Sequence, residues 1–195
     1  MTGISDRVKM HATTILSMRK YLLRNFEFSW RRTDGNWQRQ QREIYDKGDG
    51  AAVLLYDRAK QTVILIRQFR MPAFVSGYPH LMVEVAAGVL DGADPATRIK
   101  AEIEEETGYQ VSHVEKVMET YMSPGAFTEK LHLFIAEYAA RPGKGGGLED
   151  EGEDIEVLEL PFARAYAMIA QGEIVDAKTI MLLQYARLNL FKDGV

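Results

Sequence analysis

The sequence has no cysteine, no excess of basic residues and no long apolar run, and each absence excludes a class of protein. Without cysteine, neither a disulfide nor a thiolate metal site can form. The net charge of −4 at pH 7 argues against a general nucleic-acid binder, which would be basic. No apolar run reaches the roughly 18 residues that a membrane-spanning helix needs, and no signal peptide opens the chain. We therefore expect a soluble, cytoplasmic protein with neither a nucleic-acid partner nor a membrane partner.

The length and composition predict a chain that folds around one main core. A chain of 195 residues corresponds to about one domain, at roughly 100–200 residues per domain. Its 46% of hydrophobic residues is enough to fill a core. The sequence shows no internal repeat and no obvious linker. We expect residues 1–47 to form N-terminal antiparallel strands and residues 48–195 to form the main domain.

The rest of the chain is organised around residues 84–109. A short apolar strand ends at Ala87-Gly88, and a helix begins at Asp94-Pro95. Aspartate is a good N-cap, and proline at the first helical position loses no hydrogen bond because that N–H has no partner. Gly108 can adopt the left-handed conformation that ends a helix. The pattern therefore predicts a strand, a loop and a helix that stops at Gly108.

The predicted helix carries three glutamates on one face. Glu102, Glu105 and Glu106 follow the spacing i, i+3, i+4, so their carboxylates lie together. Ile99 and Ile103 fall on a neighbouring apolar stripe that would pack on a core. Convergent carboxylates beside a buried stripe favour a site for Mg²⁺ or Mn²⁺. The alternative, from the residues alone, is an ordinary acidic helix face in solvent.

Two predicted hairpins precede this segment. Asp34-Gly35 is a turn signal between an aromatic-rich strand and the polar strand 37–46. A hairpin with so little apolar surface is marginal alone, so it needs either the rest of the chain or a second chain. Its arginines, Arg42 among them, are either solubilising charges or, near a phosphate site, ligands for an anionic substrate. The apolar runs 51–57 and 62–69 predict a second hairpin inside a central sheet.

The residues after 109 predict further strands, an acidic loop and two helices. The loop 141–154 is rich in glycine and in acids, so we expect it to be mobile. It is either a plain surface loop or, beside a metal site, a loop that delivers a general base. The predicted strands are 110–122, 129–138 and 154–160, and the predicted helices are 162–171 and 177–191.

Residues 88–109 resemble the Nudix box, the signature of enzymes that hydrolyse a nucleoside diphosphate linked to another group. The family pattern is Gly, an acid six positions later, and then Arg-Glu-aliphatic-x-Glu-Glu-x-Gly-aliphatic. This chain has Gly88, Asp94 and the run AEIEEETGY. Asp94 replaces the usual glutamate, and the spacer after it is one residue short.

The third departure from the box is Ala101, which stands where the family usually has arginine. That arginine normally ties down the carboxylates. Arg98 lies one turn before Glu102 on the same face. We therefore hypothesise that Arg98 stands in for the missing arginine.

The resemblance extends over nearly all of the chain from Arg42 onward. The runs REIYDKGDGAAVLLYD, VILIRQFR, YMSPG and EDIEVLELP are similar to the GDP-mannose pyrophosphatase branch of the Nudix family, whose near neighbours are the ADP-ribose pyrophosphatases. This resemblance implies an α/β (α+β) fold, namely a Nudix α/β/α sandwich with a mixed sheet, preceded by an N-terminal antiparallel β-sheet. It also implies a homodimer that exchanges this N-terminal sheet. The implied reaction is Mg²⁺-dependent hydrolysis of GDP-mannose to GMP and mannose 1-phosphate.

The resemblance also implies a ligand set for the metal, Mg²⁺ or Mn²⁺. The backbone carbonyl of Ala87 and the carboxylates of Glu102 and Glu106 are ligands by this reasoning. Glu105 is either a further ligand or a catalytic partner of the water on the metal. Cations that bridge the diphosphate oxygens neutralise their charge and favour attack by water.

The substrate and base residues are carried over in the same way. Arg42 and Arg70 would bind the diphosphate and orient it for attack. For Arg70, a salt bridge to Glu84 is the alternative. Glu151 matches the general base, a carboxylate that takes the proton of the attacking water, although other acids of the same loop, such as Glu153, are within reach.

Three alternative functions stay open from the sequence. ADP-ribose is a rival substrate, because no residue pattern fixes guanine over adenine or mannose over ribose. A second alternative is a Nudix reaction that attacks the sugar carbon and releases GDP. The third is a non-catalytic nucleotide-sugar sensor, which the altered box would permit.

Overall fold

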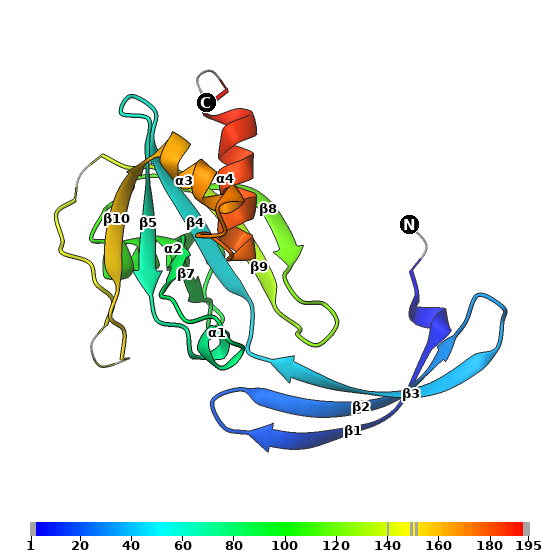
Figure 1. Ribbon diagram of the computed structural model, residues 1–195. Coiled ribbons are helices and arrows are strands. Elements are labelled where there is room, and N and C mark those ends of the chain that lie inside the picture. Colours follow the sequence, from blue (N-terminus) through cyan, green and yellow to red (C-terminus); the bar gives the residue numbers. More distant parts are fainter. Residues whose placement is uncertain (1–2, 140, 149, 151, 193–195) are drawn as a thin grey trace. The chain divides into compact units, whose positions relative to one another are not determined.

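The structure is a computed structural model that describes residues 3–139, 141–148, 150 and 152–192 (Figure 1). The chain divides into two units. One comprises the N-terminal residues through Gly48 together with the segment Tyr121–Lys130. The other comprises Asp49–Thr120 and the residues from Leu131 onward.

The N-terminal unit is built on an antiparallel sheet with the strand order β1-β2-β3. Its elements are the 3₁₀ turn η1 (Ser5–Arg7) and the strands β1 (Val8–Met18), β2 (Leu22–Arg31) and β3 (Trp37–Asp46). The predicted turn at Asp34-Gly35 joins β2 to β3. Gly35 adopts φ 87°, and its N–H donates to the carbonyl of Arg32 at 3.1 Å. The N-terminal antiparallel sheet that the sequence predicts is therefore present.

The segment Tyr121–Lys130 pairs with the end of β3. The N–H of Tyr45 donates to the carbonyl of Ala126 at 2.8 Å, and the N–H of Thr128 donates to the carbonyl of Tyr45 at 3.2 Å. The rings of Tyr45 and Phe127 meet edge to face at 5.6 Å between centroids. The sequence does not predict this pairing, because backbone hydrogen bonds between distant segments leave no local pattern.

The second unit contains a mixed sheet with the order β10-β5-β4-β9-β8, in which β6 also pairs with β5 and β7 with β4. Its strands are β4 (Gly50–Asp57), β5 (Thr62–Gln68), β6 (Met82–Glu84), β7 (Ala86–Val89), β8 (Glu115–Tyr121), β9 (Lys130–Glu137) and β10 (Glu156–Pro161). β4 runs parallel to β9 and antiparallel to β5. It is buried from Gly50 to Tyr56, as a strand covered on both faces must be.

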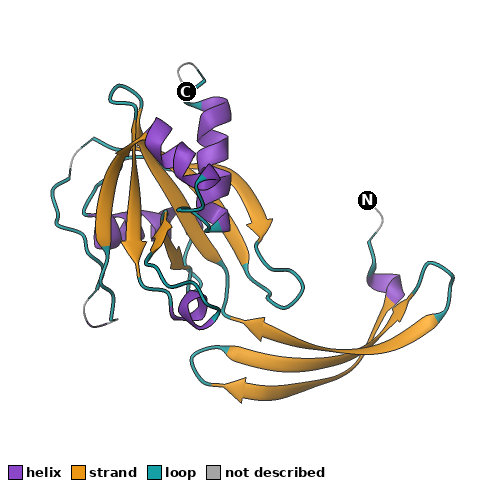
Figure 2. Ribbon diagram, in the orientation of Figure 1, coloured by secondary structure: helices purple, strands orange, loops and turns teal. Residues whose placement is uncertain are grey.

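Helices cover both faces of this sheet (Figure 2). They are α1 (Met71–Val75), α2 (Pro95–Glu102), α3 (Phe162–Ala170) and α4 (Ala177–Asn189). Val53 and Leu55 of β4 share one core cluster with Ile99 and Ile103 of the predicted box helix. Because successive side chains of a strand point to opposite faces, Tyr56 faces the other side. There its ring lies 6.4 Å from the ring of Phe191, which follows α4. The predicted α/β/α sandwich is confirmed.

The second unit contains a helix for which the sequence analysis gives no element. This helix is α1, where Pro72 occupies the first turn and loses no hydrogen bond there. The strand predicted over 110–122 begins only at Glu115. Among the residues that the structure describes, no helix is long and apolar enough to cross a membrane.

Candidate active site

The predicted strand, loop and helix bring Glu102 against Gly88. A Cβ atom on Gly88 would lie 1.7 Å from Oε1 of Glu102, so a side chain at this position would displace the carboxylate. The helix begins after Asp94, whose carboxylate accepts a hydrogen bond from the N–H of Thr97 at 2.9 Å, as an N-cap does. Gly108 ends the helix with φ 73°. The local signals in the sequence therefore predict the start of α2 and the end of the helical segment that follows it.

The last turn of the helix is wider than predicted. The sequence predicts one α-helix that runs to Gly108, but α2 ends at Glu102 and Ile103–Thr107 form the π-helical segment η2. The hydroxyl of Thr107 donates to the carbonyl of Ile103. Partners outside the helix bind further carbonyls of η2, as described below, so regular α-helical hydrogen bonds are not required there. Short π-helical segments are frequent at functional sites.

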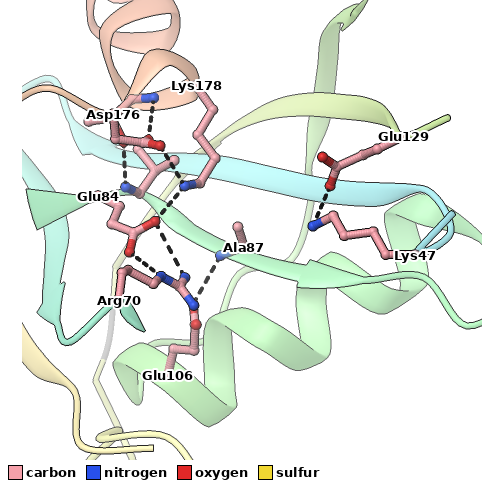
Figure 3. Close-up of polar contacts among 10 residues, drawn as sticks. Lys47, Arg70, Glu84, Ala87, Glu106, Glu129, Asp176 and Lys178 are labelled. Carbon is pink, nitrogen blue, oxygen red and sulfur yellow. Dashed lines mark hydrogen bonds and ion pairs between the residues drawn. The ribbon is translucent and has the colours of Figure 1, made fainter. Parts of the chain in front are cut away.

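Two of the predicted ligands are buried carboxylates. Glu102 and Glu106 are 7% and 2% exposed, whereas Glu105 is partly buried. Oε2 of Glu106 accepts a hydrogen bond from the N–H of Ala87 at 3.0 Å (Figure 3). Burial raises the pKa of Glu106 to about 8; the Ala87 N–H opposes this shift, and the charges of Glu102 and Glu153 add to it. Within the described residues no basic side chain forms an ion pair with Glu106, although the positive charge of Arg70 opposes part of the rise in its pKa.

Arg98 contacts two of the three glutamates. Its Nη2 lies 2.5 Å from Oε1 of Glu102, and its Nη1 lies 3.5 Å from Oε2 of Glu105. The position one turn before Glu102 is therefore close enough for the contact that the sequence suggests. The two carboxylates share one guanidinium.

A second buried glutamate, Glu84, is paired with two cations (Figure 3). Nε of Arg70 lies 2.6 Å from Oε1 of Glu84, and Nζ of Lys178 lies 2.5 Å from Oε2. Lys178 also contacts Asp176 at 3.0 Å. Burial lowers the pKa of Arg70, but the charge of Glu84 and its hydrogen bond, together with the charges of Glu106 and Asp176, outweigh burial, so that the pKa of Arg70 is raised. The salt bridge that the sequence left as the alternative for Arg70 is therefore present.

The N-terminus of α4 is fixed to the chain between β6 and β7. Asp176 accepts hydrogen bonds from the N–H and the hydroxyl of Thr179 at 3.0 and 2.6 Å. Oγ1 of Thr179 in turn accepts from the N–H of Val85 at 2.9 Å. This connection places Lys178 against Glu84. Sequence reasoning missed Lys178, and its only local signal is its place in the first turn of a helix that begins with an Asp N-cap.

The glycine-rich loop after β9 packs on η2. The N–H groups of Gly146 and Gly147 donate to the carbonyls of Glu106 and Glu105 at 2.9 and 3.1 Å. A Cβ atom on Gly145 would lie 2.4 Å from a backbone carbon of η2. The sequence predicts a mobile loop that is either a plain surface loop or a loop beside the metal site, and in the structure its described part is hydrogen-bonded to the end of the box helix. The glycines permit this close backbone contact.

The structure describes only some of the acidic residues in this loop. Glu151, the predicted base, lies outside the described residues, as does Glu149. Glu153 is described, and its Oε2 accepts a hydrogen bond from the N–H of Leu148 at 2.9 Å. Its charge is one of the causes that raise the pKa of Glu106. Glu153 is thus a loop acid that is near enough to Glu106 for its charge to act on that carboxylate.

Comparison with known proteins gives close relatives over the full length. A GDP-mannose pyrophosphatase of Cronobacter sakazakii is 49% identical over 97% of this chain and 100% of the relative. One of Pectobacterium atrosepticum is 53% identical over 94% of this chain and 95% of the relative. This chain belongs to the GDP-mannose pyrophosphatase branch of the Nudix hydrolases. It is a hydrolase, which removes the sensor alternative, and Nudix pyrophosphatases generally use a divalent metal ion.

Two further matches agree with this family assignment. Residues 7–45 match the family model described as the GDP-mannose pyrophosphatase NudK N-terminal domain. A solved structure described as an ADP compounds hydrolase superposes with a TM-score of 0.75 over 100% of this chain and 99% of that one. Because the two sequences are only 14% identical, this superposition supports the Nudix fold and no further property.

Arg42 of the hydrolase lies on β3 in the N-terminal unit. It is exposed, and its Nη1 donates to the carbonyl of Gln41 at 2.7 Å. Together with apolar residues such as Phe26, Phe28 and Ile44, it lines a cavity of about 500 Å³ in the same unit. Its predicted role as a ligand for the diphosphate stays a prediction.

The described residues of the hydrolase offer part of a metal site and not a complete cage. No group of three His, Cys, Asp or Glu among them is arranged to hold a metal ion. Mg²⁺, however, is usually bound by one or two carboxylates, and waters and substrate phosphates complete its shell. Glu102, Glu106 and the carbonyl of Ala87 fit such a site, because the buried Glu106 lacks an ion-pair partner there.

Proposed function

We propose that this hydrolase converts GDP-mannose and water to GMP and mannose 1-phosphate, with Mg²⁺ or Mn²⁺ as its cofactor. The observation that carries the proposal is the similarity to relatives named GDP-mannose pyrophosphatase, which are 49% and 53% identical over 97% and 94% of this chain. The chemistry of the site supports it, since buried acids lie beside an arginine.

Glu102, Glu106 and the backbone carbonyl of Ala87 hold the metal in this proposal, and Glu105 is a further ligand or a partner of the attacking water. Hard cations prefer such oxygen ligands. A bound dication supplies charge neutralisation for the diphosphate and favours deprotonation of water. The burial of Glu102 and Glu106 keeps their carboxylates in fixed positions, as a site for in-line attack requires.

Arg70 orients the diphosphate. Its side chain is 41% exposed although it is paired with Glu84, so the side chain is not fully enclosed by the protein. Lys178 takes the second oxygen of Glu84. Because Lys178 shares the negative charge of Glu84, Arg70 keeps more of its positive charge for a phosphate. A planar guanidinium also suits the bidentate geometry of phosphate oxygens.

A carboxylate of the loop after β9 accepts the proton of the attacking water. The family resemblance assigns this role to Glu151. The observed position of Glu153, whose charge acts on Glu106, supports Glu153 as the second candidate. Gly146 and Gly147 donate backbone hydrogen bonds to η2. These bonds hold their part of the loop beside the acids of the site.

The active enzyme is a homodimer in this proposal, and Arg42 of one subunit completes the site of the other. The N-terminal unit supports a partner chain, because β1 exposes apolar side chains such as Ile15 and Met18, which are 56% and 75% exposed. Exposed apolar clusters on a thin sheet favour association.

Subunit mixing tests the shared site. Arg42→Ala and Glu106→Gln are each inactive in this proposal, and they are unfolded and refolded together. A mixed dimer places both defects in one site and leaves the other site intact. About half of the dimers are mixed, and each mixed dimer has one intact site of its two. Activity therefore recovers to roughly a quarter of wild type. Demonstrated mixing without recovered activity would exclude the shared site.

A substrate panel tests the function itself. GDP-mannose, ADP-ribose and other nucleotide sugars are incubated with Mg²⁺, and phosphate is measured after a coupled phosphatase. We expect the highest kcat/KM for GDP-mannose, and a higher value for ADP-ribose would overturn the substrate assignment. In water enriched in oxygen-18, the label enters a phosphate group of the products; label in the mannose hydroxyl would indicate attack at the sugar carbon.

A further inference from the structure

We propose that Arg98 is the positioning residue of the metal site: its guanidinium fixes Glu102 and Glu105, in the role that the Nudix box gives to the arginine missing at Ala101. This inference rests on the proposed metal site and assigns it a residue outside the box pattern. Arg98 acts through the two glutamates and does not itself bind substrate or metal.

The guanidinium of Arg98 has three points of attachment. Nη2 contacts Oε1 of Glu102 at 2.5 Å, and Nη1 contacts Oε2 of Glu105 at 3.5 Å. Nε makes a long hydrogen bond of 3.4 Å to the carbonyl of Val89. Val89 ends β7, the strand that also carries Ala87. Arg98 therefore ties the acidic face of the helix to the strand that supplies the backbone ligand.

The contacts also fix the direction of the Glu102 carboxylate. Oε1 of Glu102 is the atom that approaches Gly88, where a Cβ would lie 1.7 Å away. The same oxygen contacts Arg98. Held between the Gly88 backbone and a guanidinium, this carboxylate has little freedom to rotate.

The spacing explains why residue 98 can take over from residue 101. Arg98, Glu102 and Glu105 follow the pattern i, i+4, i+7, which defines one helical face. Ala101 offers only a methyl group to this face. Lys100, a basic residue of the same helix, donates to the carbonyl of Ser112 at 2.8 Å and thus serves as a control for the loss of a nearby charge.

Two other accounts of Arg98 make different predictions. If it were only a surface ion pair, its loss would change helix stability slightly and leave metal binding unaltered. If its charge merely competed with the metal for Glu102, its removal would strengthen metal binding. Positioning requires that its removal weaken metal binding, because outer-shell partners orient the ligands.

The experiment measures Mn²⁺ affinity from the electron paramagnetic resonance signal of the free ion, with kcat and KM determined in parallel. The variants are Arg98→Ala, Arg98→Lys, the double variant Arg98→Ala with Ala101→Arg, and the control Lys100→Ala. We expect Arg98→Ala to raise the Kd for Mn²⁺ by about 10–100-fold, as outer-shell changes do. Arg98→Lys keeps the charge but not the fork, so it should restore little. Ala101→Arg should restore most of the lost affinity, and Lys100→Ala should bind Mn²⁺ as wild type does.

Each contrary result has a defined meaning. Unchanged or tighter Mn²⁺ binding by Arg98→Ala would overturn the positioning role while leaving the metal site standing. An equal loss in Lys100→Ala, or full affinity in Arg98→Lys, would show that charge alone matters. Failure of Ala101→Arg to restore affinity would overturn the claim that one residue replaces the other. Wild-type protein that binds no Mn²⁺ would overturn the proposed metal site, and this inference with it.

Circular dichroism checks that each variant is folded. If the alanine variant is not folded, Arg98→Lys still tests the proposal.

Discussion

Glu84 and Glu106 are two equally buried glutamates with opposite surroundings. Each is 2% exposed. Glu84 is paired with Arg70 at 2.6 Å and with Lys178 at 2.5 Å. Glu106 accepts a backbone hydrogen bond from Ala87 and lies near the like charge of Glu102. Burying a carboxylate is costly unless it is compensated. Glu84 is compensated by two ion pairs within the chain, whereas Glu106 has no ion pair among the described residues. In the proposed site, that difference separates a structural acid from a metal ligand.

The largest expected effect is that of Glu106→Gln on turnover. The change removes the ligand charge and keeps the shape of the side chain, so we expect kcat to fall by several orders of magnitude while the fold is retained. Steady-state kinetics with GDP-mannose and Mg²⁺, beside circular dichroism, checks this. Activity within about tenfold of wild type would show that Glu106 is not a ligand, because the loss of a contact that stabilises the transition state should lower kcat much more.

The loop acids should show the next largest effect. A general base acts in the transition state, so its loss lowers kcat much more than it changes KM. Because the family resemblance assigns the base to Glu151, we expect Glu151→Gln to lower kcat more than Glu153→Gln. Kinetics of the two single variants decides between them. The reverse order would give the role to Glu153, whose charge acts on Glu106.

Glu84→Gln should reduce stability rather than metal chemistry. It leaves the buried Lys178 and the partly exposed Arg70 without their carboxylate, and breaking a buried pair costs about 3 kcal/mol. Glu156→Gln is the matched control, because Glu156 pairs with Arg67 at an exposed position, where about 0.5 kcal/mol is at stake. Urea unfolding of both variants measures the difference. Equal losses would mean that Glu84 is not a structural acid.

A further expected effect is a pH dependence of the unfolding free energy of the metal-free protein. The pKa of Glu106 is raised from its ordinary value of 4.5 to about 8, so between these pH values the folded state holds a proton that the unfolded state releases. Stability from this group is therefore fully present below pH 4.5 and is lost as the pH rises toward and through 8. Unfolding free energies in a chelator, measured across this range, should fall for wild type. Glu106→Gln should remove that part of the slope, and an unchanged slope would assign it to other groups.

Local signals in the sequence predicted much of the fold and of the acidic cluster. Asp94 and Gly108 mark the ends of the box helix because caps depend on the residues next to them. The i, i+4 spacing alone placed Arg98 against Glu102, and the apolar stripe placed Ile99 and Ile103 in the core.

Contacts between distant segments were beyond such reasoning. Lys178 meets Glu84 across 94 residues, and no local pattern links them. The glycine-rich loop reads as mobile, yet Gly146 bonds to η2 through its backbone, which the sequence does not reveal. The π-helical segment η2 cannot be predicted from the local sequence for a similar reason, because the partners of its carbonyls lie elsewhere in the chain. The same glycines that suggest mobility are what allow the close contact, as Gly145 illustrates.

The most direct test of the contrast between Glu84 and Glu106 is the Mn²⁺ affinity of wild type, Glu106→Gln and Glu84→Gln, measured by electron paramagnetic resonance. The account predicts that Glu106→Gln weakens binding by at least about tenfold, whereas folded Glu84→Gln binds Mn²⁺ nearly as wild type does. Wild-type affinity in Glu106→Gln, or an equal loss in Glu84→Gln, would contradict the claim that the uncompensated acid is the one that holds the metal.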